Sequence, residues 1–253
     1  MRRRSAAWLP VAAAFLCAAV ARPAGAATFS VDPTLITLSP RASSTLLVVR
    51  NESPQPVRLQ VSAVAWSQGL DGDMQVQPTE DLVFFPSLFT LEPGQDRKVR
   101  VGTTANFGGA EKSYRLFLEQ LPPATREADA GSGIHVLTRL GIPVFLTPAA
   151  SRLSGNLSGV GLHGDSVSFT LDNTGTVHFV PETVRVVGTA STGEVVIDRK
   201  LQGWYVLAGG ARRFSLAVPA PECHRIRTMA FEVQVGTTTL KERLDTPRGT
   251  CGP

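Results

Sequence analysis

Short stretches in which apolar and polar residues alternate recur along almost the whole of this 253-residue chain. Residues 57–66 show the pattern most clearly, because Val57, Leu59 and Val61 all fall on one side of an extended segment. Proline, glycine or asparagine residues separate one stretch from the next. Strands about 8–12 residues apart with such turns between them predict β-sandwiches. Since we find no helical period of useful length, the sequence predicts an all-β fold.

The expected strands fall into two sets. In the first half we expect strands at residues 29–31, 35–38, 44–50, 57–66, 82–86, 87–91, 96–101, 114–119 and 134–144. In the second half we expect them at residues 167–171, 183–187, 194–197, 204–207, 213–218 and 230–235. A break in the pattern at residues 147–151 separates the sets. We therefore predict two sandwich domains, at residues 27–148 and 149–253.

The first 26 residues have the pattern of an export signal. Arg2, Arg3 and Arg4 precede an uncharged stretch rich in alanine and leucine, and the sequence at residues 24–26 is a small-x-small cleavage site. A retained membrane anchor is the alternative. The uncharged stretch, residues 6–21, is shorter than the roughly 20 residues that span a bilayer, so we expect a Sec-exported chain cleaved near Ala26.

Removal of this signal changes the charge balance. The chain has 25 Lys and Arg against 21 Asp and Glu, and the signal contains four arginines and no acid. The remaining chain therefore has 21 charges of each sign, and no basic stripe suggests a nucleic-acid partner.

Two cysteines, Cys223 and Cys251, remain after removal of the signal. In an oxidising compartment an even pair is most simply a disulfide. The closed loop of about 28 residues would contribute roughly 3 kcal/mol in the loop-entropy model. Two free thiols or a metal site are the alternatives, and a metal site is disfavoured because only His224 is near either cysteine in sequence.

A polar, small and partly acidic segment at residues 124–133 precedes the stretch that we expect to be the longest apolar strand, residues 134–144. We expect the polar segment to be a mobile loop. A loop that leads into a long alternating strand suits a protein that donates a strand to a partner, which favours a binding protein over an enzyme.

Several motifs in this order resemble the periplasmic pilus chaperones of the PapD-like, chaperone–usher type. The resemblance rests on residues 30–33, 46–51, 85–94 followed by 99–101, 113–122, 138–148, 171–178 and 204–209. It covers essentially the whole exported chain. Trp66 and residues 71–72 and 141–145 are similar to the branch that serves spore-coat-U-like secreted pilins.

The resemblance implies two immunoglobulin-like β-sandwich domains at an angle, with a pilus subunit bound in the cleft and delivered to an outer-membrane usher. It also implies donor-strand complementation, in which the chaperone inserts its long strand into a subunit that lacks one. The donated face would consist of Ile134, Val136, Thr138, Leu140 and Ile142. Its four aliphatic side chains would contribute on the order of 6–12 kcal/mol before ordering costs. Alternatively this face fills the core of the first domain, and both roles are compatible if the strand from Ile142 onward is core.

The chain departs from the family at one point. The family binds the carboxylate at the subunit's C-terminus with two basic residues, and the matching positions here hold Leu35 and Pro143. Arg139 and Arg41 are the nearest basic substitutes, although each is better explained as a solvated surface arginine.

Other functions find less support in the sequence. No two of the four histidines, His135, His163, His178 and His224, have metal-ligand spacing, and no nucleophile elbow, P-loop or dinucleotide motif is present. We expect no enzyme activity, cofactor, metal or small-molecule substrate. An immunoglobulin-like structural subunit or adhesin is the first alternative, and an exported hydrolase the second. A weak homodimer that covers the apolar strand is a further hypothesis.

Overall fold

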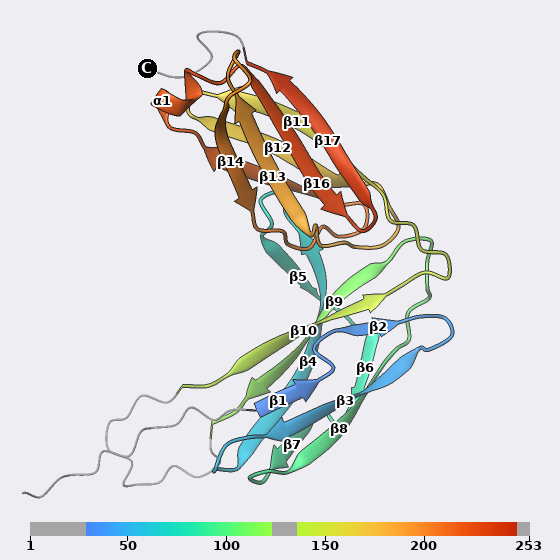
Figure 1. The fold of residues 1–253 in the computed structure, drawn as a ribbon. Helices are drawn as coiled ribbons and strands as arrows, with labels where there is room; N and C mark the ends of the chain where they lie inside the picture. The colour runs from blue at the N-terminus through green and yellow to red at the C-terminus, as the bar shows by residue number, and fades with distance from the viewer. Residues whose placement is uncertain (1–28, 123–135, 247–253) are drawn as a thin grey trace, which may run out of the picture.

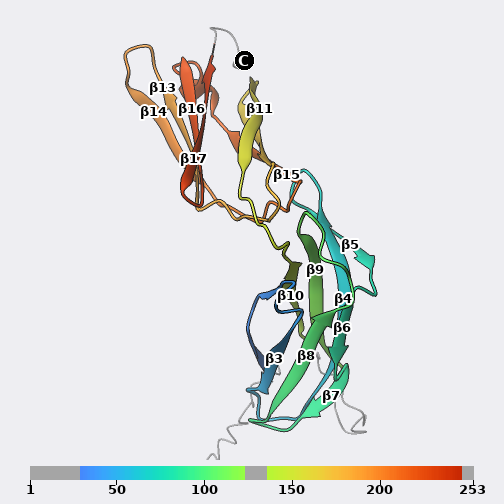
Figure 2. The same cartoon turned by 90° about the vertical axis from the view of Figure 1, so that its right-hand side faces the viewer.

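The computed structural model describes residues 29–122 and 136–246. These residues form two β-sandwiches that meet at an angle and give the molecule a bent shape (Figures 1 and 2). The two immunoglobulin-like, all-β domains that we expected are therefore confirmed. Among the described residues, no helix is long and apolar enough to cross a membrane.

The first sandwich has two sheets. Sheet A contains, in spatial order, β1 (Phe29–Asp32), β3 (Ser44–Asn51), β8 (Asp96–Thr103) and β6 (Leu82–Phe85). Sheet B contains β2 (Ile36–Leu38), β10 (Arg139–Leu146), β9 (Lys112–Gln120), β4 (Val57–Gln68) and β5 (Met74–Pro78), with β7 (Leu88–Leu91) also paired to β4. The alternating apolar residues of both sheets meet in one core, as in β4, where Val57 and Leu59 are fully buried.

The second sandwich repeats this arrangement. One sheet contains β11 (Gly155–His163), β12 (Ser166–Asn173) and β15 (Ala211–Ala217). The other contains β14 (Val195–Leu201), β13 (Thr183–Thr189), β16 (Thr228–Val235) and β17 (Thr238–Asp245). A short helix, α1 (Ala220–Cys223), follows β15, and its Cys223 is buried in the domain core.

A buried asparagine ends a central strand in each domain. Asn51 donates from Nδ2 to the carbonyl oxygens of Gln55 and Leu91. Asn173 donates to those of Val177 and Val206. Because each amide satisfies buried carbonyls of other segments, it fixes the turn that follows its strand.

Three regions differ from the expected strands. Strand β10 begins at Arg139 and not at residue 134, since residues 136–138 have no strand assignment and residues 134–135 lie outside the described part. Residues 204–207 form no named strand, and only Val206 makes a bridge, with Phe179. Strands β5, β11 and β17 and helix α1 were not predicted. The domain boundary at residue 148 stays a prediction, in the connection between β10 and β11.

Candidate functional site

Strand β10 has an edge without a partner. On one side it pairs with β9 along its whole length, from Arg139 opposite Glu119 to Leu146 opposite Lys112. On the other side it pairs with β2 only at residues 144–146. From Arg139 to Pro143 no other described strand pairs with that side. An uncovered strand edge is a template for pairing with another chain, and Figure 1 shows this end of β10 away from the domain junction.

The exposure of the expected donor residues decreases along the chain. Val136 is 61% exposed, Thr138 and Leu140 are half-buried, and Ile142 is 1% exposed. Leu140 and Ile142 pack in the core of the first domain. Ile134 lies outside the described residues. The structure therefore gives Ile142 the core role that the sequence allowed for this end of the strand.

The two arginines that the sequence offered as carboxylate anchors are on the surface. The guanidinium of Arg139 lies over the ring of Phe117 at 3.9 Å, and its Nε is 3.7 Å from Oε2 of Glu119. A carboxylate of its own domain thus already balances its charge. Arg41 is exposed in the turn between β2 and β3.

A cleft of about 390 Å³ opens beside β10 and β9, at the junction of the domains. It is lined by Trp66, Gly72, Met74, Arg115, Phe117, Gly141 and Trp204. Gly141 has no side chain where the ring of Phe117 packs, and an added Cβ would lie 2.9 Å from a carbon of that ring. The cleft is thus lined by three aromatic side chains, a methionine, two glycines and one cation.

That cation, Arg115, is the site residue that sequence reasoning missed. It is opposite Pro143 in the β9–β10 register. Its guanidinium carbon is 4.0 Å from the Trp66 ring centroid, and Nη1 donates to the carbonyl of Gly141 at 3.5 Å. Its Nε is buried without a hydrogen-bond partner, and burial lowers the pKa of the guanidinium. No ion pair joins Arg115 to a carboxylate within the described ranges.

A second half-buried arginine contacts Gly72 of the cleft wall. Arg212 of β15 contacts Gly72, whose positive φ of 89° and lack of a side chain allow the guanidinium to lie against its backbone. Nε and Nη1 of Arg212 are buried without hydrogen-bond partners, and burial lowers the pKa of this group too. Two half-buried arginines therefore lie at the cleft or next to it.

Contacts between the domains hold the cleft walls in place. The Glu111 side chain is 2% exposed, and its Oε1 is 2.6 Å from Nδ1 of His178 and accepts from the His178 amide at 3.0 Å. His178 stacks on Phe145, with ring centroids 3.7 Å apart. Beside them the amide of Arg213 donates to the carbonyl of Leu70 at 2.7 Å.

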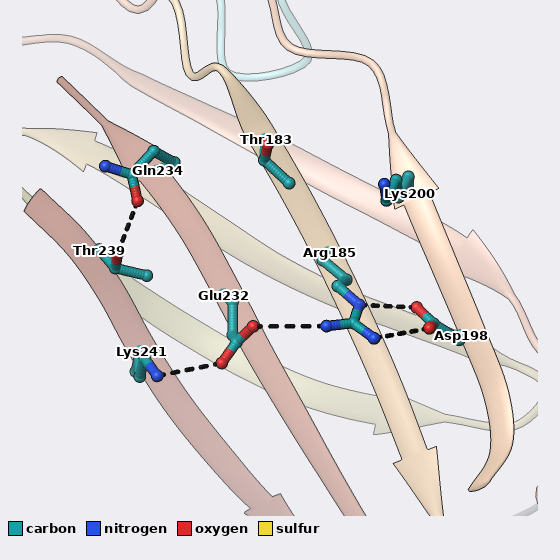
Figure 3. Close-up of a pocket in the computed structure, with 8 residues that line it drawn as sticks. All are labelled: Thr183, Arg185, Asp198, Lys200, Glu232, Gln234, Thr239 and Lys241. Carbon is teal, nitrogen blue, oxygen red and sulfur yellow. Dashed lines mark hydrogen bonds and ion pairs between the residues drawn. The ribbon is translucent and has the colours of Figure 1, made fainter. Parts of the chain in front are cut away.

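A larger hollow, about 620 Å³, lies on the outer face of the β14–β13–β16–β17 sheet (Figure 3). Its charged residues mostly neutralise one another. Lys241 pairs with Glu232 at 3.1 Å, and Arg185 pairs with Asp198 at 2.6 Å and with Glu232 at 3.8 Å. Exposed ion pairs of this kind contribute little. We assign no ligand to this hollow, and within the described ranges no group of three His, Cys, Asp or Glu side chains is placed to hold a metal ion.

Comparisons with known proteins agree with this geometry. Residues 28–152 match the family model of the pili and flagellar-assembly chaperones, PapD N-terminal domain. The search of curated proteins found no match.

Solved structures match over both domains, and at these identities they establish the fold alone. The CsuC–CsuE chaperone–tip adhesion subunit pre-assembly complex, from archaic chaperone-usher Csu pili of Acinetobacter baumannii, gives a TM-score of 0.57 at 16% identity, over 85% of this chain and 97% of that chain. The E. coli chaperone DraB gives 0.55 at 17% identity, over 88% and 98%. The Salmonella enterica SafA pilin in complex with the SafB chaperone gives 0.54 at 15% identity, over 86% and 96%.

Proposed function

Because the chain belongs to the PapD-like family of pilus chaperones, we propose that it binds a secreted β-rich pilus subunit in the periplasm and keeps it soluble until assembly. The free edge of β10, from Arg139 to Pro143, is the observation that carries this proposal. An extended strand of the subunit would pair with that edge, and main-chain hydrogen bonds would supply much of the affinity. The domains at an angle, with a cleft at their junction, leave space for the rest of the subunit.

Side chains that precede β10 would fill the subunit's groove. Val136 is exposed in the free chain, and the alternation of the sequence predicts that Ile134 would share its face in an extended donor strand. Each buried aliphatic side chain contributes roughly 1.5–3 kcal/mol. Thr138 and the half-buried Leu140 would contribute less, and Ile142 stays in the core of the chaperone.

We assign the carboxylate anchor to Arg115 in place of Arg139 and Arg41. Partial burial of a guanidinium without an acidic partner is unfavourable in the free protein. A carboxylate that enters the cleft would supply the missing partner and form a charge-assisted hydrogen bond with it. Trp66, Phe117 and Met74 would surround the apolar side chain next to that carboxylate.

Two further partners belong to the proposal. The chaperone would pass its subunit to an outer-membrane usher, and two empty chaperones would cover each other's apolar strand as a weak homodimer. By the resemblance at Trp66 and residues 71–72 and 141–145, the subunit would be a spore-coat-U-like secreted pilin. Cleavage of residues 1–26 after export would put all of these steps in the periplasm.

Co-expression with a candidate secreted pilin, ideally one encoded beside this chain, tests the proposal. We expect a stable one-to-one complex that Val136→Asp abolishes, because a carboxylate would enter an apolar groove. Val195→Asp is the matched control, since Val195 is 56% exposed on β14 of the other domain. A pilin that stays soluble and unbound with the wild-type chain would overturn the proposal.

A further inference from the structure

The outer face of sheet A carries exposed apolar side chains that the proposed function does not use. Phe85 is 79% exposed, Val83 is 48% exposed and Leu46 is 41% exposed. In the β3–β8–β6 register Leu46 and Phe85 lie on either side of Arg100, and Val83 lies opposite Gly102. Residues directly opposite one another share a face of the sheet, so these side chains form one surface. We call Leu46, Val83 and Phe85 the sheet A patch.

The patch lies at the edge of its sheet. β6, which carries Val83 and Phe85, pairs with β8 alone among the described strands. Apolar side chains scattered singly need no explanation, but a group of them on an uncovered edge strand indicates an interaction site. β10 belongs to the other sheet, so this surface differs from the subunit-binding edge.

Two cations without an acidic partner lie beside the patch. Lys98 and Arg100 alternate on the same face of β8, and neither makes an ion pair within the described part of the chain. Among the described residues, the side chain of Arg100 donates one hydrogen bond, to the hydroxyl of Ser44 at 3.3 Å. The nearby carboxylates of Asp96 and Glu52 both pair with Arg50, at 2.9 and 3.3 Å. Neither makes an ion pair with Lys98 or Arg100 in the ranges that the structure describes.

We propose that the sheet A patch binds an extended segment of a partner protein that combines aromatic or aliphatic side chains with carboxylates. The apolar side chains would cover Phe85 and Val83, and the carboxylates would pair with Lys98 and Arg100. The segment would also pair with the free edge of β6, which a lipid surface cannot do. A second copy of this chain fits less well, because a twofold contact between two such faces brings like charges together.

A synthetic peptide that alternates phenylalanine with glutamate is the probe, labelled for fluorescence anisotropy and added to the exported chain. A peptide with lysine in place of glutamate is its control. We expect the acidic peptide alone to bind, and its affinity to fall as salt rises. Phe85→Ser, and separately the double variant Lys98→Glu with Arg100→Glu, are each expected to weaken binding about tenfold or more.

Matched controls lie on β14, the edge strand of the other domain. Val195→Ser removes an exposed apolar side chain, and Lys200→Glu reverses an exposed charge, and neither is expected to change peptide binding. Thermal unfolding of every variant shows whether it folds, and Phe85 is exposed enough for its replacement to leave the core intact. Retention of the pilin complex by Phe85→Ser would separate this surface from the proposed function.

Three outcomes would overturn the inference. One is that the acidic and basic peptides bind equally well, or that neither peptide binds. Another is a concentration-dependent dimer in light scattering that Phe85→Ser abolishes, which would assign the patch to self-association. The third is binding to vesicles of anionic lipid that the same variants abolish, which would assign it to a membrane surface.

Discussion

Replacement of Arg115 by methionine is predicted to weaken subunit binding without destabilising the free protein. The guanidinium is partly desolvated, its Nε has no hydrogen-bond partner among the described residues, and burial lowers its pKa. A basic group whose pKa is lowered by folding destabilises the folded state at every pH at which it is charged. At neutral pH the replacement of Arg115 by the uncharged methionine therefore removes an unfavourable contribution to stability. Methionine keeps the apolar stem that packs on Trp66 and loses the cation–π contact, worth about 0.5–2 kcal/mol. These two effects oppose each other, so we expect the unfolding free energies of the wild-type chain and of Arg115→Met to agree within about 1 kcal/mol.

The Arg115→Met replacement should change the free energy of subunit binding by more than it changes the free energy of unfolding. A hydrogen bond to a charged group contributes about 1.5–3 kcal/mol, which corresponds to about 10- to 150-fold in affinity. The assay is calorimetric titration with a peptide that ends in the pilin's C-terminal residues, prepared as the free acid and as the amide. If Arg115 holds the carboxylate, amidation weakens binding to the wild-type chain and not to Arg115→Met. The four affinities form a double-mutant cycle whose coupling energy measures this one contact.

Arg58→Met is the matched control, because Arg58 is an exposed arginine of β4 in the same sheet. It should leave the effect of amidation unchanged. A coupling energy near zero between Arg115 and the carboxylate would refute the assignment. So would a large loss of stability in Arg115→Met, since the reasoning treats the buried charge as unfavourable in the free chain. Either result would leave the donated strand, which Val136→Asp tests, unaffected.

Three more predictions concern stability and the domain junction. Glu111→Gln should weaken the contact with His178 and broaden the distribution of interdomain angles in small-angle scattering, while His163→Gln, in the second domain, should not. Tyr114→Phe removes a buried hydroxyl that donates to an aspartate, and should cost about 1–2 kcal/mol in denaturant unfolding. Cys223→Ser should lower stability by about 3 kcal/mol, and a disulfide with Cys251 is contradicted if mass spectrometry finds both thiols free.

The disulfide prediction is consistent with where the described chain ends. Thr246 donates from its amide to the carbonyl of Arg227, and from its hydroxyl to that of Ile226. Ile226 follows Cys223 by three residues. The five residues from Thr246 to Cys251 reach at most about 18 Å when extended. The short sequence distance therefore leaves the pairing within reach, although Cys251 lies outside the described residues.

Strands with one buried face could be predicted from the sequence. The alternation at residues 57–66 is the direct result of a core in which Val57 and Leu59 are fully buried. β5 was missed because all five of its residues are exposed, and most of β17 is exposed too, so neither carries a period-2 signal. Residues 204–207 are apolar for a different reason, since Tyr205 and Leu207 pack at the domain junction. An apolar pattern in the sequence indicates that residues are buried, and it does not distinguish residues buried at a domain junction from residues buried in a sheet.

The candidate site was only half predictable for a related reason. An exposed apolar residue such as Val136 in a polar region stands out in a sequence. Arg115 is a polar residue in an alternating strand, which is also the pattern of a solvated sheet face. Only the register that brings it opposite Pro143, and the ring of Trp66 beneath it, distinguish it from an arginine such as Arg58. The sequence showed that the usual basic residues are missing, and the fold was needed to locate the alternative.

Both faces of β10 and one of its two edges are packed, which explains why the other, free edge suits binding. Ile142 and Val144 fix the strand in the core, Gly141 and Phe145 pack against the cleft and the junction, and β9 pairs with it throughout. Because both faces and one edge of β10 are already packed, the strand loses little conformational freedom when a partner strand pairs with its free edge. This lowers the entropic cost of binding.

Before Arg139, Thr138 is hydrogen-bonded to Gln120, whereas Val136 and Leu137 are exposed. Burying Val136 in a subunit would remove apolar surface from water, less the cost of ordering the side chain. The core-facing side chains of β10 are already buried in the free chain, so affinity should depend more steeply on Val136 than on them.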